Sequence, residues 1–387
     1  MRNTTIKAFL IVFLFTVWIF PNTAPSFEKD RYFDYADLQS DKIRLAVSYP
    51  IILNIKRLVE LRKRGFIPSE GLIIIGVFHG DEVYDYTESI EFVEDHNIDW
   101  MKFHKVSGEI DYDTAFKKNA LTEEFEKIFR HSNGIIFFGG DDIPPRLYNK
   151  KTHLLTDIET PARHLFELSF IFHLLGGSQD KGFVPLLESH PLYPVFGICL
   201  GCQSLNVGTG GTLVQDIWSE IYGKEYVEDA ITIPRELLHR NPHDKLYAKD
   251  VLPFGNMHPI RLVENLRLMT ATGLSVQETP YVLSRHHQAV GELGKGWIIS
   301  ATSMDGKVIE AIEHKKYPNV FGVQFHPENQ LLWDKGLKNR FSPDSEETSY
   351  RQVLEDNPPS FEFHKKLWSW FCTQLSEAKA KRDEPSR

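Results

Sequence analysis

The sequence predicts an α/β fold in which helices cover both faces of a mainly parallel central sheet. Two observations support this prediction. Strand-like apolar runs alternate with helix-like segments along most of the chain, and this order is typical of parallel strands joined by crossover helices. Continuous apolar runs, such as residues 72–78 and 134–138, also suit parallel strands that are buried on both faces.

The individual elements follow in chain order. Short apolar runs predict strands at 43–48, 72–78, 101–106, 134–138 and 195–198, and then at 260–263, 281–284, 297–301, 308–312 and 320–324. The spacing of apolar residues predicts helices at 51–64, 83–95, 123–131, 161–175 and 361–377. Between 217 and 258 the alternation stops, and the stretch is rich in charge, histidine and proline. We interpret it as an insertion or a long loop near the site, within one domain that spans residues 27–387.

The N-terminus differs in kind from the rest of the chain. Arg2 and Lys7 precede an apolar run at 8–20, and Pro21 and small or polar residues follow it. This pattern is typical of a secretory signal peptide, and the run is shorter than the roughly 20 residues that a membrane-spanning helix needs. We expect residues 1–26 to be removed on export to a periplasm, the medium or a lysosome-like lumen, leaving no stable membrane span. An uncleaved membrane anchor is the alternative.

Composition and charge narrow the class of protein. Hydrophobic residues make up 42% of the 387 residues and charged residues 25%, as in ordinary globular domains. The formal net charge of −9 argues against a nucleic-acid-binding protein, which needs a surplus of lysine and arginine. The expected partner is a small molecule, and a homodimer stays open.

Three cysteines are too few for a disulfide scaffold. In an oxidising compartment Cys202 and Cys372 could pair, or both could be buried free thiols.

The strongest local pattern surrounds Cys199. A short strand leads into Gly197-Ile198-Cys199-Leu200-Gly201, and a helix is expected to follow. This is the thiol form of a nucleophile elbow, a turn so tight that the flanking positions must be glycine. The turn places the sulfur at the carboxyl edge of the sheet and at a helix N-terminus, which favours the thiolate.

Three other interpretations of Cys199 are weaker. A redox pair with Cys202 would not need both flanking glycines, and neither would a structural cysteine. A zinc site would need a second pair of ligands at a suitable spacing, and the sequence offers none.

A second pattern follows the last expected strand, where Pro327 separates His326 from Glu328. Residues two apart in an extended segment face the same side, so the carboxylate can orient the imidazole. Together with Cys199, these residues form a candidate Cys-His-Glu triad.

These segments resemble the class I glutamine amidotransferase-like superfamily, whose fold is flavodoxin-like. The string at 197–216 (GICLGCQSLNVGTGGTLVQD) and the signature at 284–290 (SRHHQAV) look like its γ-glutamyl hydrolase branch, peptidase family C26. Phe138-Gly139-Gly140 and the pair Arg163 and Glu167 resemble the first loop of that branch and the helix after it.

The resemblance implies a role for each matching residue. Cys199 would attack a γ-glutamyl carbonyl, His326 would transfer the proton, and Glu328 would orient His326. The backbone N–H groups of Gly140 and Leu200 would form the oxyanion hole. The residues expected to bind the substrate are Gln203, His286, His287 and Gln288. No cofactor and no metal are expected.

The function predicted from these residues is hydrolysis of γ-glutamyl amide or isopeptide bonds through a thioester on Cys199. A glutaminase subunit that passes ammonia to a synthetase is one alternative, although a signal peptide argues against it. A non-catalytic binding protein of the same fold is another, although it would be expected to lack part of the triad.

Other histidines carry weaker signals. His79 and Glu82 follow an expected strand and could suggest zinc, but a solvated loop is the preferred interpretation. His239, His243 and His258 fall within 217–258, where scattered loop histidines are usually not ligands.

Overall fold

The computed structural model describes residues 30–35, 41–247 and 252–384. The predicted signal peptide lies outside the described residues. Among the described helices, none is both long and apolar enough to cross a membrane.

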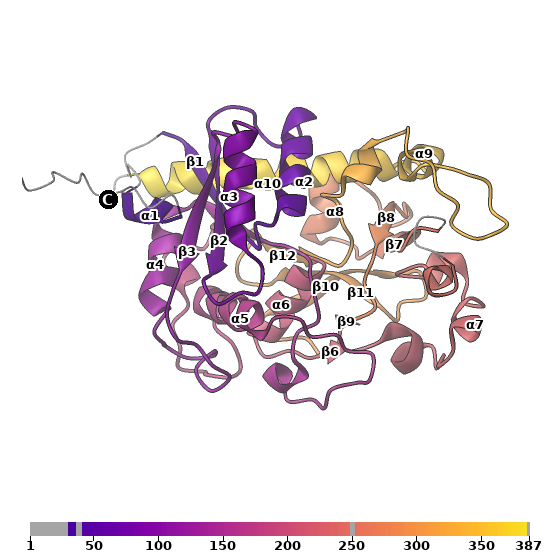
Figure 1. Ribbon diagram of the computed structural model, residues 1–387, viewed down its shortest axis with the longest axis horizontal. Helices are drawn as coiled ribbons and strands as arrows, with labels where there is room; N and C mark the ends of the chain where they lie inside the picture. The colour runs from indigo at the N-terminus through magenta and orange to yellow at the C-terminus, as the bar shows by residue number, and fades with distance from the viewer. Residues whose placement is uncertain (1–29, 36–40, 248–251, 385–387) are drawn as a thin grey trace, which may run out of the picture.

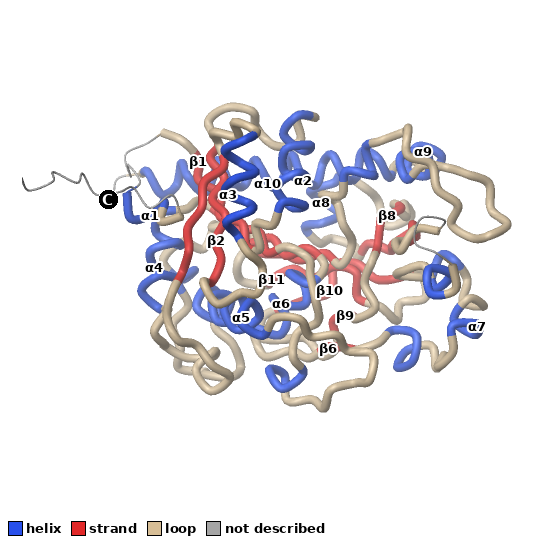
Figure 2. The backbone as a smooth tube through the Cα atoms, in the orientation of Figure 1, coloured by secondary structure: helices blue, strands red, loops and turns tan. Residues whose placement is uncertain are grey.

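One ten-stranded sheet forms the centre of the molecule (Figure 2). Its order is β3-β2-β1-β4-β5-β12-β11-β10-β7-β8. The strands are β1 (Ile43–Ser48), β2 (Leu72–His79), β3 (Met101–Val106), β4 (Gly134–Phe137), β5 (Val195–Ile198), β7 (Asn256–Leu262), β8 (Tyr281–Ser284), β10 (Trp297–Ser303), β11 (Ile309–His314) and β12 (Val320–Val323). In this spatial order, neighbouring strands are parallel from β3 as far as β12. The neighbours from β12 to β8 are antiparallel. The predicted α/β class with a mainly parallel sheet is confirmed.

Helices cover the two faces of this sheet (Figure 1). One face packs against α2 (Ile52–Lys63), α3 (Tyr86–Asp95), α8 (Arg267–Thr272) and α10 (Ser360–Asp383), and the other against α4 (Thr122–His131), α5 (Pro161–Leu175) and α6 (Leu200–Gly208). Alternation along β1 divides the core, because Leu45 and Val47 point to the first face and Ala46 to the second.

Most of the predicted elements exist, and their boundaries move for local reasons. The helix predicted at 83–95 begins at Tyr86, because the Asp85 side chain accepts a hydrogen bond from the Thr87 N–H and caps it. The short elements α1 (Tyr32–Tyr35), α8 and α9 (Tyr350–Asp356) and the two-stranded sheet of β6 (Leu213–Val214) and β9 (Ala289–Val290) were not predicted. Such short pieces carry too few residues to show a periodic pattern.

The stretch 217–258 contains mostly short helical turns, including α7 (Val227–Ala230), at the right of Figure 1. Its end is not a loop, because β7 begins at Asn256. His258 is therefore a buried strand residue, which corrects its interpretation as a loop histidine.

Two further sequence interpretations can be compared with the structure. The three cysteines are free thiols, so Cys202 and Cys372 do not pair. The solvated loop predicted around His79 is wrong for two of its residues, because His79 and Glu82 are buried. The Glu82 carboxylate accepts a hydrogen bond from the His79 N–H and another from the Tyr86 hydroxyl.

Candidate active site

Cys199 lies in the sharp turn between β5 and α6. Its backbone has φ of 55° and ψ of −109°, a combination that residues with a side chain rarely adopt. The Cys199 N–H donates to the Val323 carbonyl at 2.8 Å, which anchors the turn to β12. Strained backbone of this kind persists only where the surroundings hold it, and it concentrates at functional positions.

The two glycines of the elbow are required by close contacts. A Cβ atom at position 197 would lie 2.5 Å from the Gly201 carbonyl oxygen, and one at position 201 would overlap the Phe137 carbonyl oxygen. Any larger residue would therefore push the turn away from the sheet.

His326 reaches the same edge from the next strand. Strands β5 and β12 are parallel, with Gly197 opposite Gly322, so their carboxyl ends present Cys199 and His326 side by side. A Cβ atom on Gly139 would lie 3.3 Å from the Cys199 Cβ and 3.2 Å from the His326 Cε1, so the loop after β4 contacts both residues. Burial alone would lower the pKa of His326, but interactions with Glu328 and Cys199 raise it to about 9. The imidazole therefore stays protonated at neutral pH, opposite the sulfur.

Glu328 completes a row of charges behind His326. Its Oε1 lies 2.8 Å from His326 Nδ1 and 3.0 Å from a guanidinium nitrogen of Arg57 on α2. Glu328 is fully buried and Arg57 nearly so. Burial would raise the pKa of Glu328, but His326 and Arg57 hold it below its usual value. The carboxylate thus stays charged and fixes the imidazole from behind.

We expect Glu328→Gln to destabilise the fold by about 3–5 kcal/mol, because it leaves the buried Arg57 charge without its carboxylate. The double variant Arg57→Met/Glu328→Gln removes both charges and should recover part of that loss. Denaturant unfolding of the wild type, both single variants and the double variant measures the coupling energy. Additive effects would contradict this arrangement.

The predicted oxyanion donors come from two segments, Gly140 from the loop after β4 and Leu200 from the elbow itself. Arg163 Nη2 donates to the carbonyls of Phe138 and Gly139, at 3.0 and 3.2 Å. Because N–H and C=O are antiparallel across a trans peptide, this turns the Gly140 N–H away from Arg163. Leu200 is the first residue of α6, so its N–H has no acceptor within the helix.

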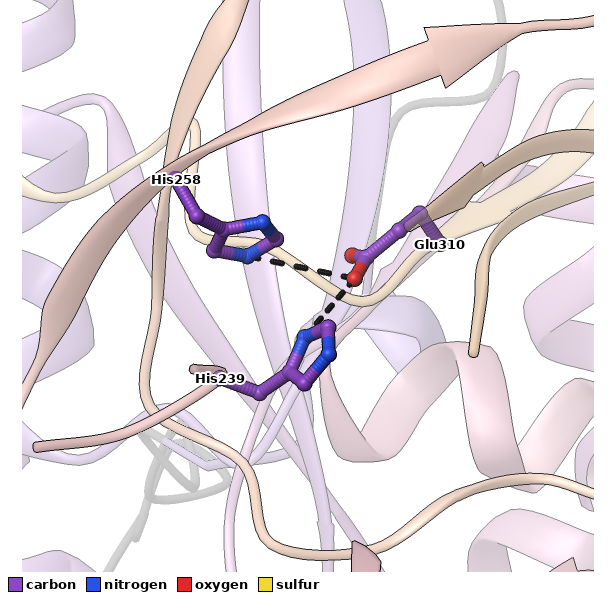
Figure 3. A group of neighbouring side chains, drawn as sticks. All are labelled: His239, His258 and Glu310. Carbon is purple, nitrogen blue, oxygen red and sulfur yellow. Dashed lines mark ion pairs between the residues drawn. The ribbon is translucent and has the colours of Figure 1, made fainter. Parts of the chain in front are cut away.

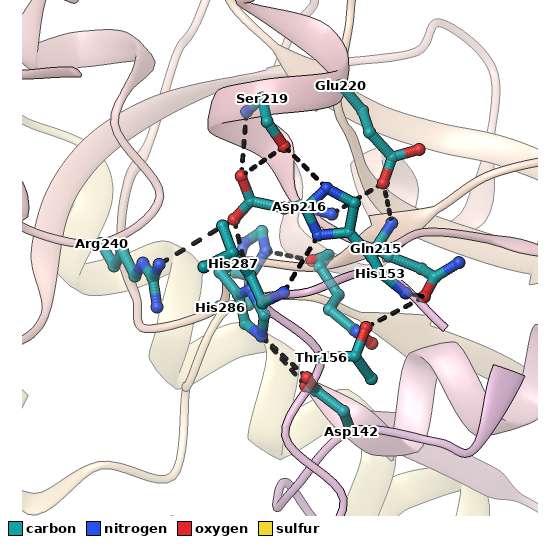
Figure 4. Close-up of polar contacts among 12 residues, drawn as sticks. Asp142, His153, Thr156, Gln215, Asp216, Ser219, Glu220, Arg240, His286 and His287 are labelled. Atoms are coloured by element: carbon teal, nitrogen blue, oxygen red, sulfur yellow. Dashed lines mark hydrogen bonds and ion pairs between the residues drawn. The ribbon is translucent and has the colours of Figure 1, made fainter. Parts of the chain in front are cut away.

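The two histidines of the signature at 284–290 point to different groups of charged residues. His287 lies between two carboxylates, with Nε2 3.0 Å from Asp142 and Nδ1 3.3 Å from Asp216 (Figure 4). Burial disfavours its charged form, but hydrogen bonds to Asp142 and Asp216 raise its pKa above the usual value. His286 instead has its Nε2 4.0 Å from Glu310.

The other two predicted substrate residues differ in their contacts, because only the Gln203 side chain has a hydrogen-bond partner within the described ranges. Gln203 Nε2 donates to the Gln288 carbonyl at 3.1 Å, and the Gln288 side chain is buried. Their contact with a substrate stays a prediction.

Sequence reasoning missed three residues of this site. Arg57 and Asp142 belong to no recognised motif, and Asp216 was quoted only as the last residue of one. The one available signal was the pair Asp141 and Asp142 directly after Gly139-Gly140, and it does not distinguish the two residues.

Comparison with known proteins agrees with this geometry. The family model of peptidase C26 matches residues 74–328, which is more than half of the chain. The chain belongs to the peptidase C26 family. The matched range contains Cys199, His326 and Glu328, as well as the loop of Gly139 and Gly140.

Relatives of this C26 protein include amidotransferase-like proteins. It is 32% identical, over 53% of its length and 73% of the relative's, to a glutamine amidotransferase-like protein of Rickettsia prowazekii. It is also 32% identical to a Mycobacterium tuberculosis protein whose name assigns it to the glutamine amidotransferases, with 51% of each chain covered, so the match spans about half of that relative. An anthranilate synthase beta subunit of Arabidopsis thaliana is 28% identical, over 40% of this chain and 45% of that one.

Proposed function

We propose that this C26 protein is an exported γ-glutamyl hydrolase that uses a cysteine nucleophile and no cofactor. The observation that carries the proposal is the strained elbow at Cys199 beside a buried, protonated His326 that Glu328 holds in place. The pattern of residues 1–26 supports export. Membership of a peptidase family supports hydrolysis.

The reaction would proceed in two halves. The Cys199 thiolate attacks the γ-carbonyl carbon, and the N–H groups of Gly140 and Leu200 stabilise the oxyanion. His326 gives its proton to the leaving amine nitrogen as the C–N bond breaks, which leaves a γ-glutamyl thioester. His326 then takes a proton from water, the hydroxide attacks the thioester, and free glutamate leaves as the thiolate and imidazolium are restored.

Charged groups around Cys199 can recognise the glutamyl end. Burial lowers the pKa of Arg285, while attraction to Cys199 and Glu328 acts in the opposite direction. We assign Arg285 to the substrate α-carboxylate. The carboxylates of Asp142 and Asp216, which hold His287 between them, supply negative charge that suits the α-ammonium group.

A substrate panel tests the proposal. We expect the full-length protein to release glutamate from γ-glutamyl amines, γ-glutamyl peptides or folyl polyglutamates, and the α-glutamyl isomers to be cleaved at least about 100-fold more slowly, since their α-groups cannot occupy the same contacts. Mass spectrometry of the products and of trapped enzyme measures both turnover and the thioester, with Cys199→Ala as the blank. Release of glutamate without a Cys199 adduct would contradict the mechanism.

The second candidate is a glutaminase subunit, which the likeness to an anthranilate synthase subunit favours. In the same panel it would act on free glutamine and release ammonia, and γ-glutamyl peptides would be poor substrates.

A further inference from the structure

Away from the thiol, four ligand-type side chains meet in the interior of the antiparallel half of the sheet. They are His239 from the segment before β7, His258 on β7, His286 after β8 and Glu310 on β11. All four are at most 4% exposed. Figure 3 shows the His239 and His258 rings turned toward the Glu310 carboxylate.

The distances within this histidine cluster suit a shared cation. His239 Nδ1 lies 2.9 Å and His258 Nε2 3.8 Å from Glu310 Oε1, and His286 Nε2 lies 4.0 Å from Oε2. Ligand atoms of His239, His258 and Glu310 all lie within 4.8 Å of one another. Two ligands at about 2.0–2.2 Å from a tetrahedral zinc ion are roughly 3.3–3.6 Å apart, and the contacts of His239 and His258 with Glu310 bracket that range. His286 lies outside this three-residue group and would move toward the ion to become the fourth ligand.

Several ligand atoms of this cluster have no hydrogen-bond partner among the described residues. Both Glu310 oxygens, both His239 ring nitrogens and His286 Nε2 are buried without a hydrogen-bond partner in the described part of the chain. His239 Nδ1 lies 2.9 Å from Glu310, yet the two are not aligned as donor and acceptor. A buried carboxylate without a compensating partner destabilises the fold, and a coordinated cation would offset that cost.

The outer contacts of two histidines match those of metal ligands. His286 Nδ1 lies 2.8 Å from the Gln288 carbonyl and His258 Nδ1 lies 3.1 Å from the Pro259 carbonyl. A carbonyl only accepts, so each Nδ1 carries the proton and each Nε2 presents its lone pair to the cluster, as metal-bound histidines do. The Ser284 hydroxyl lies 2.8 Å from His258 Nε2, and it would rotate away when a metal takes that lone pair.

A comparable group elsewhere lacks these features. Asp34, His104 and Glu124 also gather, but Arg31 and Lys127 already pair with these carboxylates. That group is compensated without a metal.

We propose that His239, His258, His286 and Glu310 form a structural site for one zinc-class divalent metal. Three imidazoles and one carboxylate give a closed, four-coordinate set with no open position, which is typical of structural rather than catalytic zinc. By coordinating residues from all three, the metal would cross-link the segment that contains His239 to strands β7 and β11. It would also hold His286, and so fix the position of the neighbouring residue His287. The site does not depend on the proposed hydrolase activity.

Metal content and zinc titration of the full-length protein test this site. All titrations use Cys199→Ala protein, so that zinc cannot bind the reactive thiol. We expect about one zinc per chain by elemental mass spectrometry, and after chelation one saturable Zn²⁺ site whose filling raises the melting temperature. Co²⁺ in the same site should show the absorption bands of tetrahedral cobalt.

Matched variants locate the metal. Added to this background, His239→Ala and Glu310→Gln should each weaken Zn²⁺ binding by at least about 10–100-fold, the loss that is typical even for an outer partner of a ligand. His243→Ala, a histidine of the same segment outside the cluster, should leave it unchanged. The proposal is overturned if chelated protein with an intact cluster shows no saturable Zn²⁺ binding, or if His239→Ala binds as tightly as its parent. The first result is independent of whether any variant folds.

Discussion

Cys199→Ala is expected to abolish turnover while the protein stays folded. The thiolate forms the covalent bond of the reaction, and Cys202, the other cysteine of this segment, is fully buried on α6. Loss of a covalent nucleophile that acts with a base typically lowers kcat by about 10⁴–10⁶-fold. Measured kcat/KM on the best substrate of the panel should therefore fall to the blank, with an unchanged circular dichroism spectrum.

Cys202→Ala is the matched control for this result. Cys202 is fully buried on α6, and burial raises its pKa well above the usual value, so it stays a thiol. We expect its removal to cost roughly 1 kcal/mol of stability through lost packing and to leave kcat near normal. A thiol-alkylating reagent should modify Cys199 first. Near-normal activity in Cys199→Ser would refute the nucleophile assignment.

His326→Ala is expected to approach the same blank. His326 moves a proton in both half-reactions, and it is also the cationic partner of the sulfur, so the nucleophile and the general acid fail together. Glu328→Gln should keep measurable activity, since the carboxylate only orients and charges the imidazole. Near-normal kcat/KM in His326→Ala would assign the base to another residue, with His286 or His287 as the first replacements to test.

The pH profile gives a second measure of the same residue. Because the pKa of His326 is raised to about 9, the imidazolium persists at neutral pH, and kcat/KM should fall as the pH rises through about 9. Its contribution to stability has the same sign, since it is complete below the unfolded pKa of about 6.5 and lost as the pH rises through the folded value. Glu328→Gln removes a charge that raises this pKa, so its alkaline limb should move to lower pH. An unmoved limb would contradict the coupling.

The fold class and the reacting residues Cys199 and His326 could be predicted from sequence because the patterns that indicate them are local. Apolar runs mark β5 and β12 by themselves, and parallel strands bring their carboxyl ends to one edge whatever lies between them in sequence. Gly197 and Gly201 flank Cys199 because the turn excludes side chains there. A few consecutive residues therefore carry enough geometry to predict Cys199 and His326 together.

Arg57 and the histidine cluster could not be predicted in this way. Arg57 sits in an ordinary amphipathic helix, and only the packing of α2 on the sheet brings it to Glu328. The cluster depends on antiparallel pairing, in which β10 lies between β7 and β11.

The sequence by itself determined the elements, the elbow and the residues at the ends of β5 and β12, because backbone sterics and side-chain periodicity act over a few residues. Tertiary structure alone decided which charges surround His326, that His287 lies between Asp142 and Asp216, and that His239 and Glu310 meet. Those contacts join side chains from separate elements, and their positions depend on how whole helices and strands pack, which no local pattern records.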